Sequence, residues 1–270
     1  MKEEFYLHIY HKQELIEPVP SNKEIANWAL DLLNLVYPER LTCPTFSLAE
    51  IKQLFTDSEN ELLHILGATK ACSDCDNKSI SAAFYKGLPE LYRQMNTDIT
   101  ATLNGDPAAS SEFEIIRTYP GFLAVSLYRI AHYLLLLGVP LIPRILTEYA
   151  HSITGIDIHP AAKIGEYLFV DHGTGIVIGE TTEIGNHVKL YQSVTLGALS
   201  VEKYMANTKR HPTIGDNVII YSGATILGGD TFIGEHSIIG GNVWLTKSVP
   251  PYSTVYHQSA MKVVETKHKD

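Results

Sequence analysis

An isoleucine, valine or leucine recurs every six residues from about residue 156 onward, and this period constrains the fold more than any other feature of the chain. The positions that share it are Ile158, Ile164 and Val170; Ile178, Ile184, Leu190 and Leu196; Ile214, Ile220 and Ile226; and Ile233, Ile239 and Leu245. A period of six fits neither an α-helix, which repeats at 3.6 residues, nor an ordinary strand, which repeats at two. It is typical of a parallel β-helix, in which three six-residue units form one coil and stacked coils bury one apolar column. We expect roughly four coils, with glycines turning the corners because glycine tolerates the required backbone angles.

The six-residue period breaks in three places, and each break predicts a bulge or a loop outside the coil. The period slips by two residues at 171–175, is lost between Leu196 and Ile214, and slips by one residue near 228–230. Loops on a rigid scaffold commonly carry function. The first two breaks are therefore where we look for chemistry.

The rest of the chain divides into three predicted parts. Residues 1–155 should form an α-helical assembly domain, 156–256 the β-helix, and 257–270 a mobile tail. Capping boxes, which mark helix starts, are Ser21 with Glu24, Ser47 with Glu50 and Ser58 with Glu61. A longer helix is expected over 79–103, ended by 104–105, with others after 120–121 and up to 154–155.

Composition limits the classes of partner. The net charge is −9, which argues against nucleic acid and against anionic membranes. The first residues are acidic and are not followed by an apolar signal segment, and no apolar stretch reaches the about 20 residues of a membrane span. With three cysteines, an odd number that suits a reducing compartment, we expect a cytoplasmic protein.

Cys72 and Cys75 form a C-x-x-C pair. A structural zinc site takes four ligands, and only Cys43 and His64 are candidates to complete one here. The prediction is a loop between helices that carries two thiols, with a metal or redox site as the alternative.

His172 and Asp157 are the first candidates for chemistry. A histidine on a bulge is well suited to take a proton near neutral pH, although it is equally consistent with a surface histidine in a glycine-rich corner. Asp157 lies fifteen residues earlier, close to the eighteen of one coil, so its carboxylate is predicted to reach and orient the imidazole. The alternative for Asp157 is a polar residue that caps the first coil.

Arg210 and His211 end the long break. A guanidinium is a rigid fork of donors suited to a carboxylate, whereas the alternative is the solvated basic end of a loop. Asp106, followed by Pro107, is typical of a helix N-cap when taken by itself. The chain has no G-x-S-x-G, P-loop or H-E-x-x-H motif. A direct attack assisted by a general base fits these residues better than a covalent intermediate.

Taken in order, these motifs resemble the serine O-acetyltransferase family, a family of hexapeptide-repeat acyltransferases. The segments that carry the resemblance are 106–108, 121–122, 128–132, 157–165, 171–181, 192–197 and 210–215, and together they span about 106 to 250. The resemblance implies an α + β fold with an N-terminal α-helical domain followed by a left-handed parallel β-helix. It also implies a homotrimer or a dimer of trimers, with active sites between neighbouring β-helices.

The family further implies acetyl transfer from acetyl-CoA, a co-substrate, to the hydroxyl of L-serine, giving O-acetylserine and CoA in cysteine biosynthesis. His172 is implied as the base and Asp157 as its orienting carboxylate. The implied ligands of the serine amino group are Asp106 and Asp171, and those of its carboxylate are Arg210 and His211, with His211 counted in the catalytic set as well. The implied coenzyme contacts are Gly197, Ala198, Ser222 and Gly241, with backbone amides near Gly197 stabilising the oxyanion. No metal is expected.

The chain departs from the family pattern in two segments. The stretch 198–209 is about four residues longer than the usual loop and lacks glycine, and 255–260 replaces the segment that usually lies near the coenzyme. The sequence ends at Asp270 without the terminal isoleucine that docks into O-acetylserine sulfhydrylase, so a stable complex with that enzyme is not predicted.

Three other functions stay open on the sequence. A hexapeptide acyltransferase for a sugar or another alcohol fits the same scaffold. A zinc lyase of the γ-carbonic-anhydrase type needs three converging histidines, for which His159, His172, His187 and His211 are candidates. A purely structural or regulatory β-helix is the third alternative.

Overall fold

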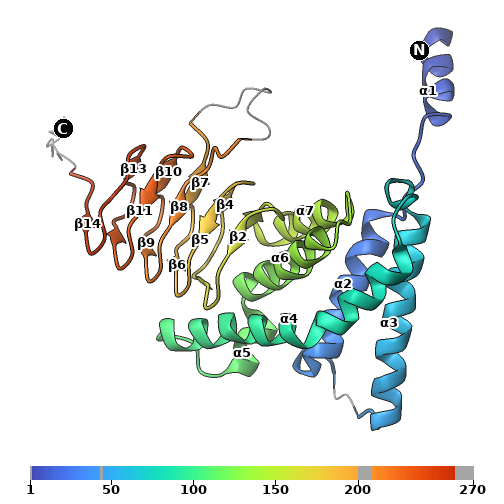
Figure 1. The fold of residues 1–270 in the computed structure, drawn as a ribbon, viewed down its shortest axis with the longest axis horizontal. Coiled ribbons are helices and arrows are strands. Elements are labelled where there is room, and N and C mark those ends of the chain that lie inside the picture. Colours follow the sequence, from blue (N-terminus) through green and yellow to red (C-terminus); the bar gives the residue numbers. More distant parts are fainter. Residues whose placement is uncertain (1, 43–44, 200–207, 259–270) are drawn as a thin grey trace, which may run out of the picture.

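The computed structural model describes residues 2–42, 45–199 and 208–258 and shows α-helices followed by short parallel strands (Figure 1). The helices are α1 (Glu3–Gln13), α2 (Asn22–Val36), α3 (Leu48–Ala68), α4 (Asn77–Gly105), α5 (Glu112–Thr118), α6 (Pro120–Leu136) and α7 (Ile142–Thr154), with 3-10 turns η1 (Pro38–Arg40) and η2 (Lys70–Cys72). The strands are β1 (Asp157–Ile158), β2 (Lys163–Ile164), β3 (Phe169–Val170), β4 (Val177–Ile178), β5 (Glu183–Ile184), β6 (Lys189–Leu190), β7 (Thr195–Gly197), β8 (Thr213–Ile214), β9 (Ile219–Ile220), β10 (Thr225–Leu227), β11 (Phe232–Ile233), β12 (Ile238–Ile239), β13 (Trp244–Leu245) and β14 (Thr254–Val255). The predicted α + β architecture is confirmed. Residue Cys43 and most of the 198–209 and 257–270 segments lie outside the described residues.

The strands form the three faces of a left-handed β-helix, as predicted. The three parallel sheets have the orders β1-β4-β7-β10-β13, β11-β8-β5-β2 and β14-β12-β9-β6-β3. Strands β1–β12 form four coils, and β13, a bridge at Val249 and β14 add one element to each sheet and form a fifth. The aliphatic residues of the six-residue period are stacked in register, for example Ile158 on Ile178 and Ile178 on Leu196. Their side chains point inward and form one buried column.

The breaks in the period correspond to longer coils. In the first sheet, successive stacked partners from Ile158 to Leu245 are 20, 18, 30 and 19 residues apart. The strands therefore stay in register across all three breaks, and the extra residues of the two-residue and one-residue slips lie in the corners between strands. The predicted bulges at 171–175 and 228–230 are confirmed, whereas most of the long break lies outside the described residues.

The glycines that follow the buried aliphatic residues have a different purpose from the one predicted. They are Gly165, Gly179, Gly185, Gly197, Gly215, Gly234 and Gly240, and none has a positive φ. A Cβ on Gly185 would lie 2.9 Å from the backbone nitrogen of Asp216, and one on Gly215 would lie 2.8 Å from that of Glu235. Glycine is needed here because the next coil approaches closely. The left-handed corner positions are held mostly by other residues: Tyr167, His172, His187, Ser193, Asn217, His236, Asn242 and Tyr252.

The helical half follows the sequence signals with one exception. The capping boxes at Ser21 and Ser47 begin α2 and α3, and Gly155 ends α7 in the left-handed conformation. The predicted helix start at Ser58 is wrong, because α3 continues through it. Ser58 is buried, and its hydroxyl bonds to the Tyr85 hydroxyl at 2.5 Å, so a tertiary partner replaces the expected cap.

Helix α6 covers the open end of the first coil. The backbone groups of parallel strands point alternately to either side, so this coil donates to the second coil, for example from Lys163 to the carbonyl oxygen of Thr182, and also presents carbonyl oxygens on its open side. Three side chains of α6 contact these carbonyls: Tyr128 donates to Ala162, Arg129 to Ile164 and Gly165, and a ring nitrogen of His132 lies 2.7 Å from the oxygen of Pro160.

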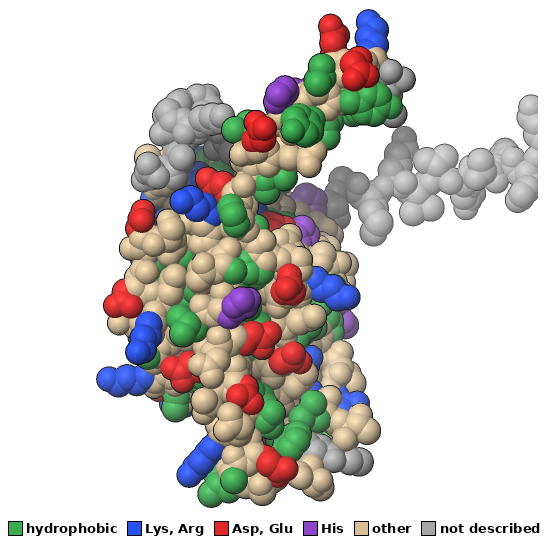
Figure 2. Space-filling model, turned by 90° about the vertical axis from the view of Figure 1, so that its right-hand side faces the viewer, with side chains coloured by type: hydrophobic (Ala, Val, Ile, Leu, Met, Phe, Trp, Pro, Cys, Tyr) green, Lys and Arg blue, Asp and Glu red, His purple; other side chains and the backbone are tan. Residues whose placement is uncertain are grey.

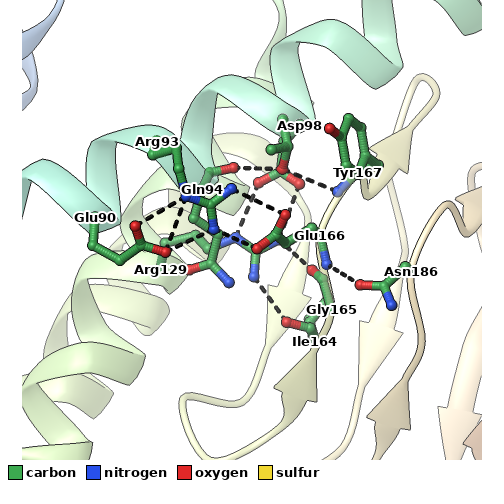
Figure 3. Close-up of polar contacts among 11 residues, drawn as sticks. Glu90, Arg93, Gln94, Asp98, Arg129, Ile164, Gly165, Glu166, Tyr167 and Asn186 are labelled. Atoms are coloured by element: carbon green, nitrogen blue, oxygen red, sulfur yellow. Dashed lines mark hydrogen bonds and ion pairs between the residues drawn. The ribbon is translucent and has the colours of Figure 1, made fainter.

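Arg129 also joins α6 to α4 (Figure 3). Its guanidinium binds both carboxylate oxygens of Asp98 at 2.9 Å, and Asp98 in turn accepts the N–H of Leu168 at 2.9 Å. Both side chains of this ion pair are buried. A second and exposed ion pair joins Arg93 to Glu90 and Glu166. Polar contacts therefore join the helical domain to the first coil.

Helix α1 lies apart from the rest of the described chain, and Figure 2 shows its apolar side chains in the open. None of its residues is buried, and Phe5 and Tyr10 are 50% and 61% exposed. None of the helices in the described ranges combines the length and the apolar character that crossing a bilayer requires.

Candidate active site

His172 lies at the corner that leads from β3 into β4. Its φ of 57° is in the left-handed region, which costs a residue with a side chain roughly 1–2 kcal/mol. Its side chain is 70% exposed, and its Nε2 is 3.7 Å from Oδ1 of Asp171. The corner thus holds an accessible imidazole beside a carboxylate, an arrangement that suits a general base.

Asp106 reaches the same corner from the helical domain. The alternative of a helix N-cap is wrong, because Asp106 is the C-cap of α4 and the next helix begins only at Glu112. Its two oxygens accept the N–H of Ala108 at 2.8 Å and the hydroxyl of Tyr119 at 2.7 Å. These hydrogen bonds, together with the charges of Lys189 and His172, hold the pKa of the Asp106 carboxyl below its ordinary value, so the group is an anion at neutral pH.

Asp157 lies in β1, on the face of the first sheet. Its stacked neighbour in the second coil is Val177, because the bulge at 171–175 lengthens the first coil to 20 residues. Among the described residues, no hydrogen bond or ion pair joins Asp157 to His172. The expected pair is not formed within one chain, and an orienting role for Asp157 stays a prediction.

Arg210 and His211 lie at the corner between β7 and β8. Arg210 forms an ion pair with Glu180, and its side chain is only 16% exposed. The His211 side chain is buried, and its Nδ1 is 3.1 Å from the backbone nitrogen of Thr181. Burial, with the positive charge of Arg210, lowers the pKa of His211 to about 4. The alternative of a solvated loop end is therefore wrong for both residues.

The predicted site residues fall on two edges of the β-helix, one on each side of the first sheet. The edge that enters this sheet carries Asp171 and His172 and, in later coils, Ser222 and Gly241, which stack on each other. The edge that leaves the sheet carries Gly197, Ala198, Arg210 and His211. Within the described part of the chain, no hydrogen bond or ion pair connects the site residues of one edge to those of the other.

The candidates for a metal site do not come together in one chain. In the described ranges, no group of three or more His, Cys, Asp or Glu side chains is placed to hold a metal ion. His187 stacks on Tyr167 with ring centres 4.3 Å apart. Cys72 and Cys75 lie in the expected turn between α3 and α4, where burial and the second thiol raise the pKa of Cys72 to about 11.

Three further residues of the site were not among the predicted site residues. Tyr119 donates to Asp106; burial and this hydrogen bond raise its pKa to about 12, so its hydroxyl keeps its proton. Lys189 donates to the carbonyl oxygen of Gly105 at 2.8 Å and ties the end of α4 to the second coil. Thr181 binds His211. Each acts on a residue distant in the sequence, so the local sequence does not reveal the contact.

A left-handed β-helix with a histidine and carboxylates on one edge and an arginine–histidine pair on the next defines a hexapeptide-repeat acyltransferase. No protein-family model matches the chain. It is 40% identical over 261 residues to a serine acetyltransferase (plasmid) of Synechococcus elongatus, which covers 88% of this chain and 82% of that protein. The chain belongs to the serine acetyltransferase family.

Solved structures agree with this family. Serine acetyltransferase 1 of Entamoeba histolytica in complex with L-cysteine has a TM-score of 0.75 and 38% identity, and the match covers 85% of this chain and 86% of that one. The Neisseria gonorrhoeae serine acetyltransferase in complex with serine has a TM-score of 0.62 and 28% identity, with 89% and 95% covered.

Proposed function

We propose that this chain transfers the acetyl group of acetyl-CoA to the hydroxyl of L-serine, giving O-acetylserine and CoA for cysteine biosynthesis. The observation that carries the proposal is the exposed imidazole of His172, 3.7 Å from Asp171 and near the charge of Asp106. His172 takes the hydroxyl proton while the serine oxygen attacks the thioester carbonyl directly. General-base assistance of this kind contributes about 10²–10⁴-fold.

The charges on the two edges support an amino acid as the acceptor. L-Serine carries an ammonium group, which suits Asp106 and Asp171, and a carboxylate, which suits Arg210 and His211. A neutral sugar alcohol offers no such pair of charges, so it would form no ionic contact with these groups. The complex of the Neisseria gonorrhoeae relative with serine is consistent with this choice.

We propose that each site is completed by two chains of a homotrimer or of a dimer of trimers. A single chain separates the His172 edge from the Arg210 edge, yet one small acceptor must contact both. In a ring of parallel β-helices, the His172 edge of one protomer faces the Arg210 edge of its neighbour. The same interface would bring Ser222 and Gly241 opposite Gly197, so that acetyl-CoA lies along the groove between chains.

The free thiols of Cys72 and Cys75 and the acidic composition support a cytoplasmic location. This location also fits a reaction that consumes acetyl-CoA.

Thiol release from acetyl-CoA tests the acceptor, with L-serine, homoserine, threonine and an amino sugar compared at equal concentrations. Turnover confined to L-serine is the expected result, because only that acceptor places its hydroxyl at His172 while both charged ends are bound. Release with the amino sugar alone would favour the sugar-acyltransferase alternative. Binding of acetyl-CoA without turnover of any acceptor would refute the proposed reaction.

Mixing two inactive variants tests whether the site is shared. His172→Asn and Arg210→Met each disable one edge, and random mixed trimers leave about a quarter of the interfaces with both edges intact. The refolded or co-expressed mixture should therefore recover about that fraction of wild-type turnover. Activity no higher than that of the separate variants, in trimers shown by mass to be mixed, would place the whole site within one chain.

A further inference from the structure

Thr181 contacts both the backbone and the imidazole of the Arg210–His211 pair. It lies on the corner after β4, one coil before the pair. Its Oγ1 accepts the N–H of Arg210 at 2.9 Å and the N–H of His211 at 3.1 Å. Its backbone N–H donates to Nδ1 of His211 at 3.1 Å, and its Oγ1 lies 2.9 Å from the same nitrogen. One residue therefore both anchors the returning loop and orients the ring.

These contacts decide which nitrogen of His211 carries the proton. A backbone N–H can only donate, so Nδ1 of His211 must accept and is unprotonated. The lone pairs of Oγ1 of Thr181 are used by two backbone N–H groups, which leaves the hydroxyl hydrogen for Nδ1 as well. A neutral imidazole with an unprotonated Nδ1 carries its hydrogen on Nε2.

The surroundings of the ring favour its neutral form. His211 is 8% exposed, and a Cβ on Gly179 would lie 2.2 Å from Nε2, so the ring lies against the backbone of the coil before it. The neighbouring cations Arg210 and Lys209 disfavour an imidazolium, while the Glu180 carboxylate opposes them less strongly. Among the described residues, Nε2 of His211 has no hydrogen-bond partner.

We propose that Thr181 is a positioning residue that fixes His211 as a neutral hydrogen-bond donor, whose Nε2–H binds an acceptor oxygen of the substrate. The inference rests on the proposed function and refines it. His211 then removes no proton and carries no charge: Arg210 supplies the charge for the serine carboxylate, and His211 supplies a directed hydrogen bond. Proton removal is left to His172.

Nitrogen-15 NMR of histidine-labelled enzyme tests the state of His211, with His211→Gln used to assign its signals. From about pH 6 to about pH 8, where an ordinary histidine titrates, we expect Nε2 to stay protonated and Nδ1 to stay unprotonated. Thr181→Val removes the hydroxyl but keeps the shape and the backbone N–H that donates to Nδ1, so Nδ1 should stay unprotonated while its nitrogen-15 signal shifts. Thr181→Ser keeps the hydroxyl and should preserve the wild-type spectrum.

Kinetics test the role of this state. Thr181→Val should raise KM for L-serine about 10-fold or more, whereas Thr181→Ser should stay within about threefold. The amide of His211→Gln has an N–H that can replace Nε2–H. This variant should therefore keep about 10-fold more kcat/KM than His211→Leu.

Several results would overturn the inference. A protonated Nδ1, or a His211 that titrates in this pH range in the wild type, would refute the neutral donor. Equal losses in His211→Gln and His211→Leu would refute the donated hydrogen bond, and an unchanged Nδ1 signal and KM in Thr181→Val would refute the role of Thr181. The NMR measurement needs no turnover, so failure of the proposed reaction with L-serine would be recognised separately.

Discussion

Replacing His172 by asparagine is expected to lower kcat for acetyl transfer by at least about 100-fold, because it removes the group that takes the serine proton. Asparagine tolerates the left-handed backbone better than most residues, so the φ of 57° at this corner should be kept. The measurement is thiol release at saturating L-serine and acetyl-CoA. The mass of the oligomer, measured by size-exclusion chromatography, should be unchanged.

His187→Asn is the matched control for this substitution. His187 also has a φ of 57°, but it lies at a different corner and stacks on Tyr167. Its replacement should leave kcat within about twofold of the wild type, since surface changes away from special contacts have small effects. A His172→Asn enzyme as active as this control would remove His172 from the role of base.

Replacing Arg129 by methionine is expected to lower the free energy of unfolding by about 3–5 kcal/mol, the usual result of removing one partner of a buried ion pair. The change leaves the buried Asp98 carboxylate without its cation, and it leaves the carbonyl oxygens of Ile164 and Gly165 without a donor. Urea unfolding at one fixed protein concentration measures the effect, because association of the chains adds to stability.

Arg93→Met is the control for the buried pair, because Arg93 forms a comparable fork with Glu90 and Glu166 on the surface (Figure 3). Exposed pairs contribute about 0–1 kcal/mol, so this variant should unfold close to the wild type. Equal destabilisation by the two substitutions would show that burial does not explain the contribution of the Arg129 pair to the free energy of unfolding.

The β-helix was predictable because each of its coils repeats the same short-range rule. An aliphatic residue every six positions is enough to fix the inward face, and a slip in the period is enough to locate a bulge. The glycines were misinterpreted because a close approach between coils, as at Gly185, leaves the same mark in a sequence as a left-handed turn. The structure separates the two causes through the backbone angles.

The functional residues were predictable only where a local motif marks them. Ser58 and Asp106 have the local pattern of a helix cap, yet Ser58 bonds to Tyr85 and Asp106 to Tyr119. The contact of Thr181 with His211 likewise joins residues 30 positions apart. Such contacts depend on how coils and helices are stacked, which residue type and spacing alone do not encode.

The cover that α6 forms over the first coil also affects whether other molecules can add to this end of the β-helix. An uncovered end of stacked strands presents a row of free N–H and carbonyl groups, on which the strands of another molecule can add. Solenoid proteins usually prevent this with a specialised capping repeat. Here Tyr128, Arg129 and His132 occupy those carbonyls instead. The helical domain thus closes a surface that would otherwise be a template for end-to-end fibre growth, and the first coil keeps the ordinary repeat sequence.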